Sequence, residues 1–159
     1  MEDEQIKSLR EHLLEILRGG GAHLTPDEVV ESIPAALRGL RAGSFEHSPW
    51  ELLEHMRIAQ WDIYQFSINP KHKSPEWPEG YWPEKPAPAS PAAWSKSVKQ
   101  FLGDLRDMQQ LVSKSSTDLF APIPHGSGQT ILREALLLAD HNAYHLGQMV
   151  AVRKALEKV

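Results

Sequence analysis

Hydrophobic positions recur at intervals of three and four residues in four long stretches of the chain, which predicts four amphipathic helices. The first of these stretches ends at three consecutive glycines, a sequence that stops a helix. No stretch alternates apolar and polar residues as a half-buried strand does, and no repeat of fixed period is present. The predicted helices lie at 4–18, 49–67, 91–112 and 131–156.

A serine or threonine followed by proline marks three helix starts, of which one opens an additional short helix. In "TPDE", Thr25 can cap a short helix, the proline suits the first helical position and the glutamate completes a capping box. The same arrangement recurs in "SPWE" at Ser48, and "SPAAW" opens a helix at Pro91. Four principal helices with long connectors predict an all-α fold, an antiparallel four-helix bundle in a single domain that spans 1–159.

The connector at 69–90 has an unusual composition. Seven of the chain's twelve prolines lie within 70–91. Long loops without regular structure are usually either functional or disordered. Prolines alone are typical of a linker, whereas aromatic residues in the same segment favour a loop that packs onto the domain, over a cavity. Whether this loop is a lid is left open. The aromatic residues are Trp77, Tyr81 and Trp82.

Charge and composition exclude several classes of function. The formal net charge is -4 and lysine and arginine form no dense cluster, which argues against a nucleic-acid partner. No apolar run approaches the roughly 20 residues of a membrane span, and the N-terminus does not read as a signal peptide, so we expect a cytoplasmic protein. The chain has no cysteine, which excludes disulfides, thiolate metal sites and a cysteine nucleophile.

Two histidines stand four residues apart in "LLLADHNAYHLGQMV". Residues four apart share one face of a helix, so the imidazoles of His141 and His145 can bind the same cation. Leu137 and Leu138 precede the pair and Gln148 follows it, so we expect this face to point inward. The same spacing also arises by chance in two hydrogen-bonded or surface histidines, and two ligands alone are an incomplete site.

His55 is the candidate for a third ligand. It lies between Leu52 and Ala59 on the second long helix, and facing helices of a bundle bring such residues together in the core. A histidine among apolar residues is also typical of a hydrogen-bonded core position. The remaining histidines are expected on the surface, in solvated loops or at a helix boundary; they are His12, His23, His47, His72 and His125.

The sequence assigns no hydrogen-bond partner to these imidazoles, and no catalytic residue or general base. Ligand histidines usually donate their other N–H to a carboxylate or a carbonyl. Asp62 lies two turns after the third candidate ligand, Asp140 points about 100° away from the pair on an ideal helix, and Glu51 is explained by capping. Gln148 and Tyr144 are candidates for lining a cavity, although core positions are the more typical interpretation of both.

"HSPWELLEHMRIAQWDI", followed much later by "DHNAYHLGQMV", resembles the DinB/YfiT-like superfamily of helical metalloenzymes, which includes the DNA-damage-inducible DinB proteins of bacteria. The resemblance covers nearly the whole chain in layout. It implies a four-helix bundle with a divalent metal ion, most often zinc or nickel, bound by three histidines. The matching residues here are His55, His141 and His145. It also implies that the protein can form a homodimer.

Three functions are consistent with this sequence. The leading hypothesis is a metal-dependent enzyme of the transferase or hydrolase type that acts on a small molecule. Members of the wider superfamily transfer thiols, and in a chain without cysteine the thiol would come from a co-substrate. The alternatives are a non-catalytic metal or small-ligand binding protein, and a helical dimerisation domain with structural histidines. The sequence does not choose the metal, the substrate or the reaction.

Overall fold

The computed structural model describes residues 3–43 and 45–158. Within them the chain is all-helical, as predicted, and the described residues form no strand. An isolated β-bridge joins Pro122 and Thr130 ahead of the last helix. Two short 3-10 helices lie at Ala35–Leu37 and Glu79–Tyr81. The α-helices are α1 (Asp3–Arg18), α2 (Pro26–Glu31), α3 (Pro49–Ile68), α4 (Pro91–Ser113) and α5 (Ile131–Leu156).

The helix starts follow from local capping. Ser48 accepts a hydrogen bond from the backbone N–H of Glu51, and the Glu51 carboxylate accepts one from the backbone N–H of Ser48. The same reciprocal pair joins Thr25 and Glu28 at the start of α2, and Ser90 caps α4. These bonds satisfy backbone donors that no preceding turn can reach. The predicted helix starts at three serine- or threonine-proline sequences are therefore confirmed.

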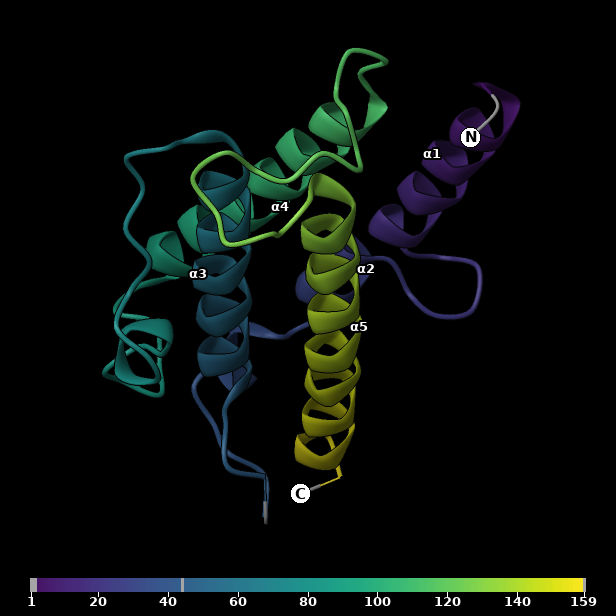
Figure 1. Cartoon of the computed structure of the whole chain (residues 1–159). Helices are drawn as coiled ribbons and strands as arrows, with labels where there is room; N and C mark the ends of the chain where they lie inside the picture. The colour runs from purple at the N-terminus through teal and green to yellow at the C-terminus, as the bar shows by residue number, and fades with distance from the viewer. Residues whose placement is uncertain (1–2, 44, 159) are drawn as a thin grey trace.

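Two long helices frame the centre of the molecule. In Figure 1, α3 and α5 lie side by side and run in opposite directions, while α4 crosses behind α3. α1 packs against α4 and α5. Two clusters of buried apolar side chains fill the space between the helices, one beside α2 and one beside α1. The first includes Val30, Met56, Phe101 and Met149, and the second includes Leu13, Ile63, Met108 and Leu138.

The buried face of α5 differs from the predicted one at one position. Leu138 is buried, but Leu137 is 37% exposed. Adjacent residues on a helix point about 100° apart, so both cannot face the core. The buried face instead runs from Leu138 through Asn142 and His145 to Met149. The expectation that Leu137 points inward was wrong.

The connector between α3 and α4 packs against α3. The Asp62 carboxylate accepts hydrogen bonds from the ring of His72 and from the hydroxyl of Tyr81. Ser48 donates a hydrogen bond to the carbonyl of Pro86 further along the connector. The interpretation as a packed loop is therefore confirmed for these contacts, although Trp77 is 70% exposed.

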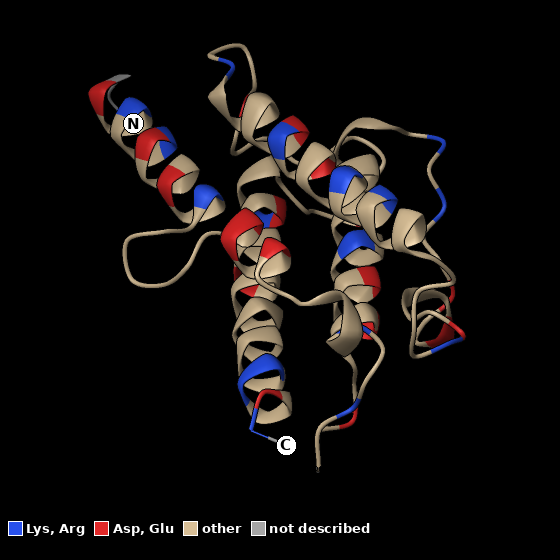
Figure 2. Cartoon of the chain, turned by 180° about the vertical axis from the view of Figure 1, so that it is seen from behind, with Lys and Arg blue, Asp and Glu red and all other residues tan. Residues whose placement is uncertain are grey.

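The charged residues are distributed rather than concentrated. Seen from behind, α1 and α4 carry lysine or arginine interspersed with aspartate or glutamate (Figure 2). None of the helices in the described part of the chain is long and apolar enough to cross a membrane.

A candidate metal centre between two helices

His55 of α3 and His141 and His145 of α5 lie together. One ring nitrogen from each residue lies within 4.8 Å of the corresponding nitrogens of the other two. The Nε2 atoms of His55 and His141 are 3.0 Å apart, and the ring of His145 meets that of His55 edge-on, with the centroids 4.6 Å apart. The antiparallel packing of α3 and α5 thus brings together the three residues that the sequence singled out.

Burial keeps all three imidazoles neutral near pH 7. His55 is 4% exposed and His145 is 8% exposed. The pKa of His55 falls to about 4, chiefly because the ring is buried; the hydrogen bond to the carbonyl of Tyr81 opposes the shift, and the imidazoles of His145 and His47 add to it. The pKa of His141 falls to about 3, chiefly because the ring is buried and to a smaller extent because His145 and His55 lie close by. Burial also lowers the pKa of His145. Neutral imidazole is the form that binds a metal ion.

Two of the three rings are oriented by carbonyl oxygens. His55 donates from Nδ1 to the backbone carbonyl of Tyr81 over 3.0 Å, and His145 donates from Nδ1 to Oε1 of Gln148 over 2.7 Å. A carbonyl oxygen only accepts, so each Nδ1 carries the proton and each Nε2 keeps a free lone pair. The Nδ1 of His141 is buried and has no hydrogen-bond partner among the described residues.

This donor set fits a divalent transition metal. Two nitrogens that bind one zinc ion at 2.0–2.1 Å with tetrahedral angles lie about 3.3 Å apart. The observed 3.0 Å between His55 and His141 is close to that separation. Imidazole suits zinc, nickel, copper and iron, so the donors are consistent with a metal ion without selecting one.

One hypothesis from the sequence paired Asp62 with His55; in the structure Asp62 instead binds residues of the connector, one of which contacts His55. The two carboxylate oxygens of Asp62 bind the ring of His72 and the hydroxyl of Tyr81, each over 2.6 Å. Burial and the Asp62 carboxylate raise the pKa of Tyr81 to about 12, so the phenol stays protonated and donates. The backbone carbonyl of the same tyrosine accepts from His55. His72, expected to be solvated, is held in this network with its side chain 6% exposed.

The other proposed carboxylates lie elsewhere. Asp140 is exposed on α5. Glu51 caps α3, as expected, and binds the guanidinium of Arg41 with both carboxylate oxygens. Among the described residues, the three-histidine group itself contains no carboxylate.

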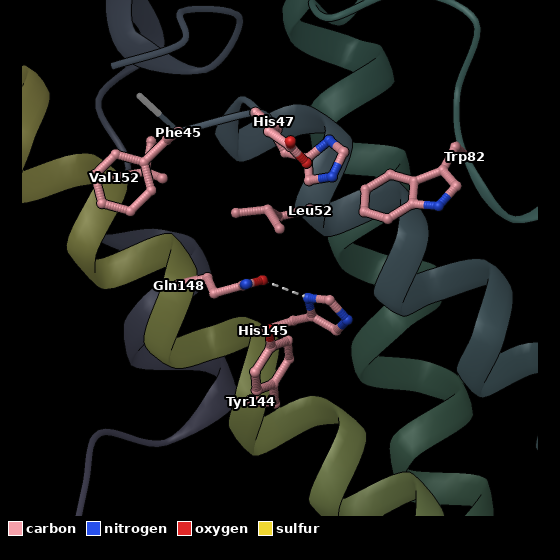
Figure 3. A pocket seen from close by; sticks show the side chains of 9 residues that line it. Phe45, His47, Leu52, Trp82, Tyr144, His145, Gln148 and Val152 are labelled. Carbon is pink, nitrogen blue, oxygen red and sulfur yellow. Dashed lines mark hydrogen bonds between the residues drawn. The ribbon is translucent and has the colours of Figure 1, made fainter. Parts of the chain in front are cut away.

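A cleft of about 320 Å³ opens beside this group, and His145 is the member of the group that lines it. Figure 3 shows His145 and Gln148 of α5 on one side of the cleft, joined by their hydrogen bond, with Tyr144 beside them. Tyr144 and Gln148 line this cleft, one of the two positions considered for them, and the core position favoured from the sequence is wrong for Tyr144, which is 63% exposed. In the same view His47 and Leu52 lie above His145, Trp82 lies above and to the right of it, and Phe45 lies at the left beside Val152.

Trp82 separates the cleft from His55. Its ring stacks on that of His55 at 3.9 Å and 3° and on that of His47 at 4.0 Å and 20°, and it meets the ring of His145 edge-on at 6.4 Å. His47 therefore packs near the start of α3, as expected, and also lines the cleft, which the sequence did not indicate. The helical periodicity of the sequence predicts neither the stacking of Trp82 on His55 nor the hydrogen bond from His55 to the carbonyl of Tyr81.

A comparison with protein families identifies the relatives of this chain. The model of the DinB superfamily matches residues 25–149. This chain belongs to the DinB superfamily. The DinB superfamily match includes His55, His141 and His145, and it confirms the resemblance inferred from the sequence. Comparisons with curated proteins and with solved structures gave no match.

Proposed function

We propose that this member of the DinB superfamily is a metal-dependent enzyme of the transferase or hydrolase type that acts on a small molecule. The observation that carries the proposal is the buried group of three neutral imidazoles, whose nitrogens lie within 4.8 Å of one another. His55, His141 and His145 would hold a divalent cation, with zinc and nickel as the first candidates. Three protein ligands leave a coordination position for a guest, as catalytic sites do.

The surrounding residues have distinct roles in this proposal. A divalent ion in a three-histidine site supplies Lewis acidity toward a bound oxygen or sulfur atom. Tyr81 and Gln148 hold two of the imidazoles in the tautomer that presents Nε2. Trp82 covers the ring of His55 and keeps water from that side. The cleft beside His145 admits the substrate.

A thiol co-substrate is consistent with this site. The chain contains no cysteine, so it has no thiol nucleophile of its own. A small-molecule thiol that enters the cleft would bring its sulfur toward His145, beside the proposed ion. The hydrolase form of the proposal differs only in using water in place of the thiol.

A non-catalytic metal or ligand binding protein is the second candidate. It is favoured by one observation: the described group of three histidines includes no carboxylate that would serve as a general base. Turnover of an electrophilic substrate with a thiol or with water would decide for the enzyme. Saturable binding without turnover would decide for the binding protein.

The overall architecture is part of the same proposal. We infer that α1, α3, α4 and α5 constitute the antiparallel four-helix bundle of the DinB/YfiT-like type, because both apolar clusters include residues of α3, α4 and α5 and one adds α1. Homodimer formation, a cytoplasmic location and a small molecule rather than nucleic acid as partner stay predictions.

Metal content is the first experiment. We expect elemental analysis of the purified protein to find close to one divalent ion per chain. His55→Ala and His141→Ala each remove one ligand and should lose most of the metal while the helical circular dichroism persists. His12→Ala is the matched control, because His12 lies exposed on α1 with its side chain 68% accessible. Full metal content in both ligand variants would contradict the proposed site.

A further inference from the structure

The described side chains that line the cleft beside His145 include an acidic residue but no lysine or arginine. The acidic residue is Glu46, which is exposed. The permanent charge among the lining side chains is therefore the negative charge of Glu46, while a divalent ion bound by the three histidines would place positive charge at the His145 end of the cleft.

The nearest arginines in the sequence do not line the cleft. Arg41 is bonded elsewhere, because both carboxylate oxygens of Glu51 accept from its guanidinium. A guanidinium held by a carboxylate is less available to an anionic ligand. Arg153 of α5 is not among the lining residues; its Nε lies 3.6 Å from the carboxylate of Glu157, without a hydrogen bond in the described part of the chain. A carboxylate or phosphate at the Glu46 end of the cleft thus meets an acidic residue and no arginine among the described lining residues.

Aromatic side chains make up much of the remaining surface. Tyr144 is 63% exposed, Phe45 is 37% exposed, and Trp82 lies on the far side of the cleft from Phe45 (Figure 3). The faces of such rings attract organic cations, and they also accommodate neutral apolar groups. A carboxylate next to exposed aromatic rings is a suitable environment for an ammonium group, and it disfavours an anion.

We propose that the substrate of this site is an amine-bearing small molecule whose cationic body lies against Glu46, Phe45 and Tyr144, while a metal-binding atom at its other end reaches past His145. This inference rests on the proposed function, because the metal-binding end requires the three-histidine site. The cleft volume of about 320 Å³ lies at the lower end of the range of ligand sites, which fits a small molecule.

Three para-substituted benzohydroxamic acids of similar size test the inference. 4-(Hydroxymethyl)benzohydroxamic acid is the neutral probe, 4-(aminomethyl)benzohydroxamic acid carries an ammonium group, and 4-carboxybenzohydroxamic acid carries a carboxylate. All three share the same metal-binding end and differ in the charge of the body. Calorimetric titration at low ionic strength, where screening is weak, compares their dissociation constants for zinc-loaded and metal-free protein.

For the zinc-loaded protein we expect the ammonium probe to bind about threefold to tenfold more tightly than the carboxylate probe, with the neutral probe between them. Glu46→Gln should remove the advantage of the ammonium probe over the neutral one, and Glu46→Lys should reverse the order. Glu11→Gln is the matched control, since it removes the same charge from an exposed position on α1. Equal affinities for the three probes, or tightest binding of the carboxylate probe, would overturn the inference.

Failure of the proposed function gives a different result. If none of the probes binds the zinc-loaded protein more tightly than the metal-free protein, the three-histidine site itself is wrong. If all bind only the zinc-loaded protein and charge has no effect, the metal site stands and the inferred substrate class falls.

Discussion

The Nε2 atom of His55 lies 3.0 Å from the Nε2 atom of His141, although 86 positions separate the two residues in the chain. The contact exists because α3 and α5 pack side by side in opposite directions (Figure 1). Both rings are desolvated, and the Nδ1 of His141 has no described partner. A cation bound by both Nε2 atoms needs the two helices packed in this way, so it would bind the folded protein and not the unfolded chain.

Metal binding should therefore stabilise the fold. An ion that binds the folded state and not the unfolded state adds about 2.7 kcal/mol when its free concentration is a hundredfold above its dissociation constant. For a domain of this size we expect zinc to raise the melting temperature of the metal-free protein by roughly 5–10 °C. Differential scanning calorimetry with and without zinc measures the shift, and a chelator should reverse it.

The variant His141→Ala separates this effect from nonspecific ion binding. It removes a ligand from the site, so zinc should leave its melting temperature unchanged. His125→Ala, in an exposed loop, should keep the full response of the wild type. An equal shift in His141→Ala and wild type would rule out the three-histidine site as the source of stabilisation.

The Tyr81 side chain should tune the metal site without touching it. Its hydroxyl donates to Asp62, and this bond holds the backbone carbonyl that accepts from His55. Tyr81→Phe removes the hydroxyl and leaves the ring, so the carbonyl loses its anchor and the His55 ring is less fixed. We expect zinc affinity to fall roughly tenfold, the lower end of the range for such supporting groups. Competition with a chromophoric chelator measures the change.

Tyr144→Phe is the control for that experiment. Tyr144 is 63% exposed and its ring lies 4.9 Å from that of His145, so the variant removes a hydroxyl of the same kind near the same site. Its zinc affinity should match the wild type. If Tyr81→Phe also matches the wild type, the link from Asp62 through Tyr81 to His55 has no energetic role.

The sequence anticipated those parts of the structure that depend on local signals. Ser48 and Thr25 cap helices because each side-chain oxygen accepts from a backbone N–H three residues later. This relationship involves only four consecutive residues, so it can be recognised in the sequence. His141 and His145 share a face for an equally local reason. Such signals do not say which helices pack together, so the apolar neighbours of His55 made it only a candidate third ligand, and the family resemblance implied its partnership with this pair.

The supporting residues were harder to anticipate. Asp62 was considered because it follows His55 by two turns, yet its partners are His72 and Tyr81. The group that binds His55 is a backbone carbonyl, which every residue has and which no side-chain pattern marks. The position of Trp82 depends on the path of an irregular loop, and helical periodicity carries no information about it.

Acid should destabilise the metal-free protein in a defined range. The pKa values of His55 and His141 fall from an ordinary 6.5 to about 4 and about 3 in the folded state. As the pH falls below about 6.5, the unfolded chain binds protons that the folded chain does not, so the free energy of unfolding decreases until the folded pKa values are reached. Urea denaturation at about pH 8 and about pH 5 should show lower stability at the acidic value.

His141→Gln identifies the source of that pH dependence. Glutamine does not titrate, so the variant should lose less stability between the two pH values than the wild type does. His12→Gln, at an exposed position, should behave as the wild type. An unchanged pH dependence in His141→Gln would show that other groups cause the acid sensitivity.

Gly39 should be needed for the connector to lie where it does. A Cβ atom at this position would meet the Cβ of Ala87 and lie 3.0 Å from its Cα, so the Gly39→Ala variant must displace the backbone of the connector. We expect it to lower the free energy of unfolding by about 1–3 kcal/mol and to weaken zinc binding, because the connector carries Tyr81. Gly147→Ala is the matched control: its Cβ meets nothing within 4 Å, and alanine in the middle of a helix should stabilise α5 by about 0.5–1 kcal/mol. Urea titration of both variants measures the difference, and wild-type stability together with wild-type zinc affinity in Gly39→Ala would mean that the close approach to Ala87 does not position the connector.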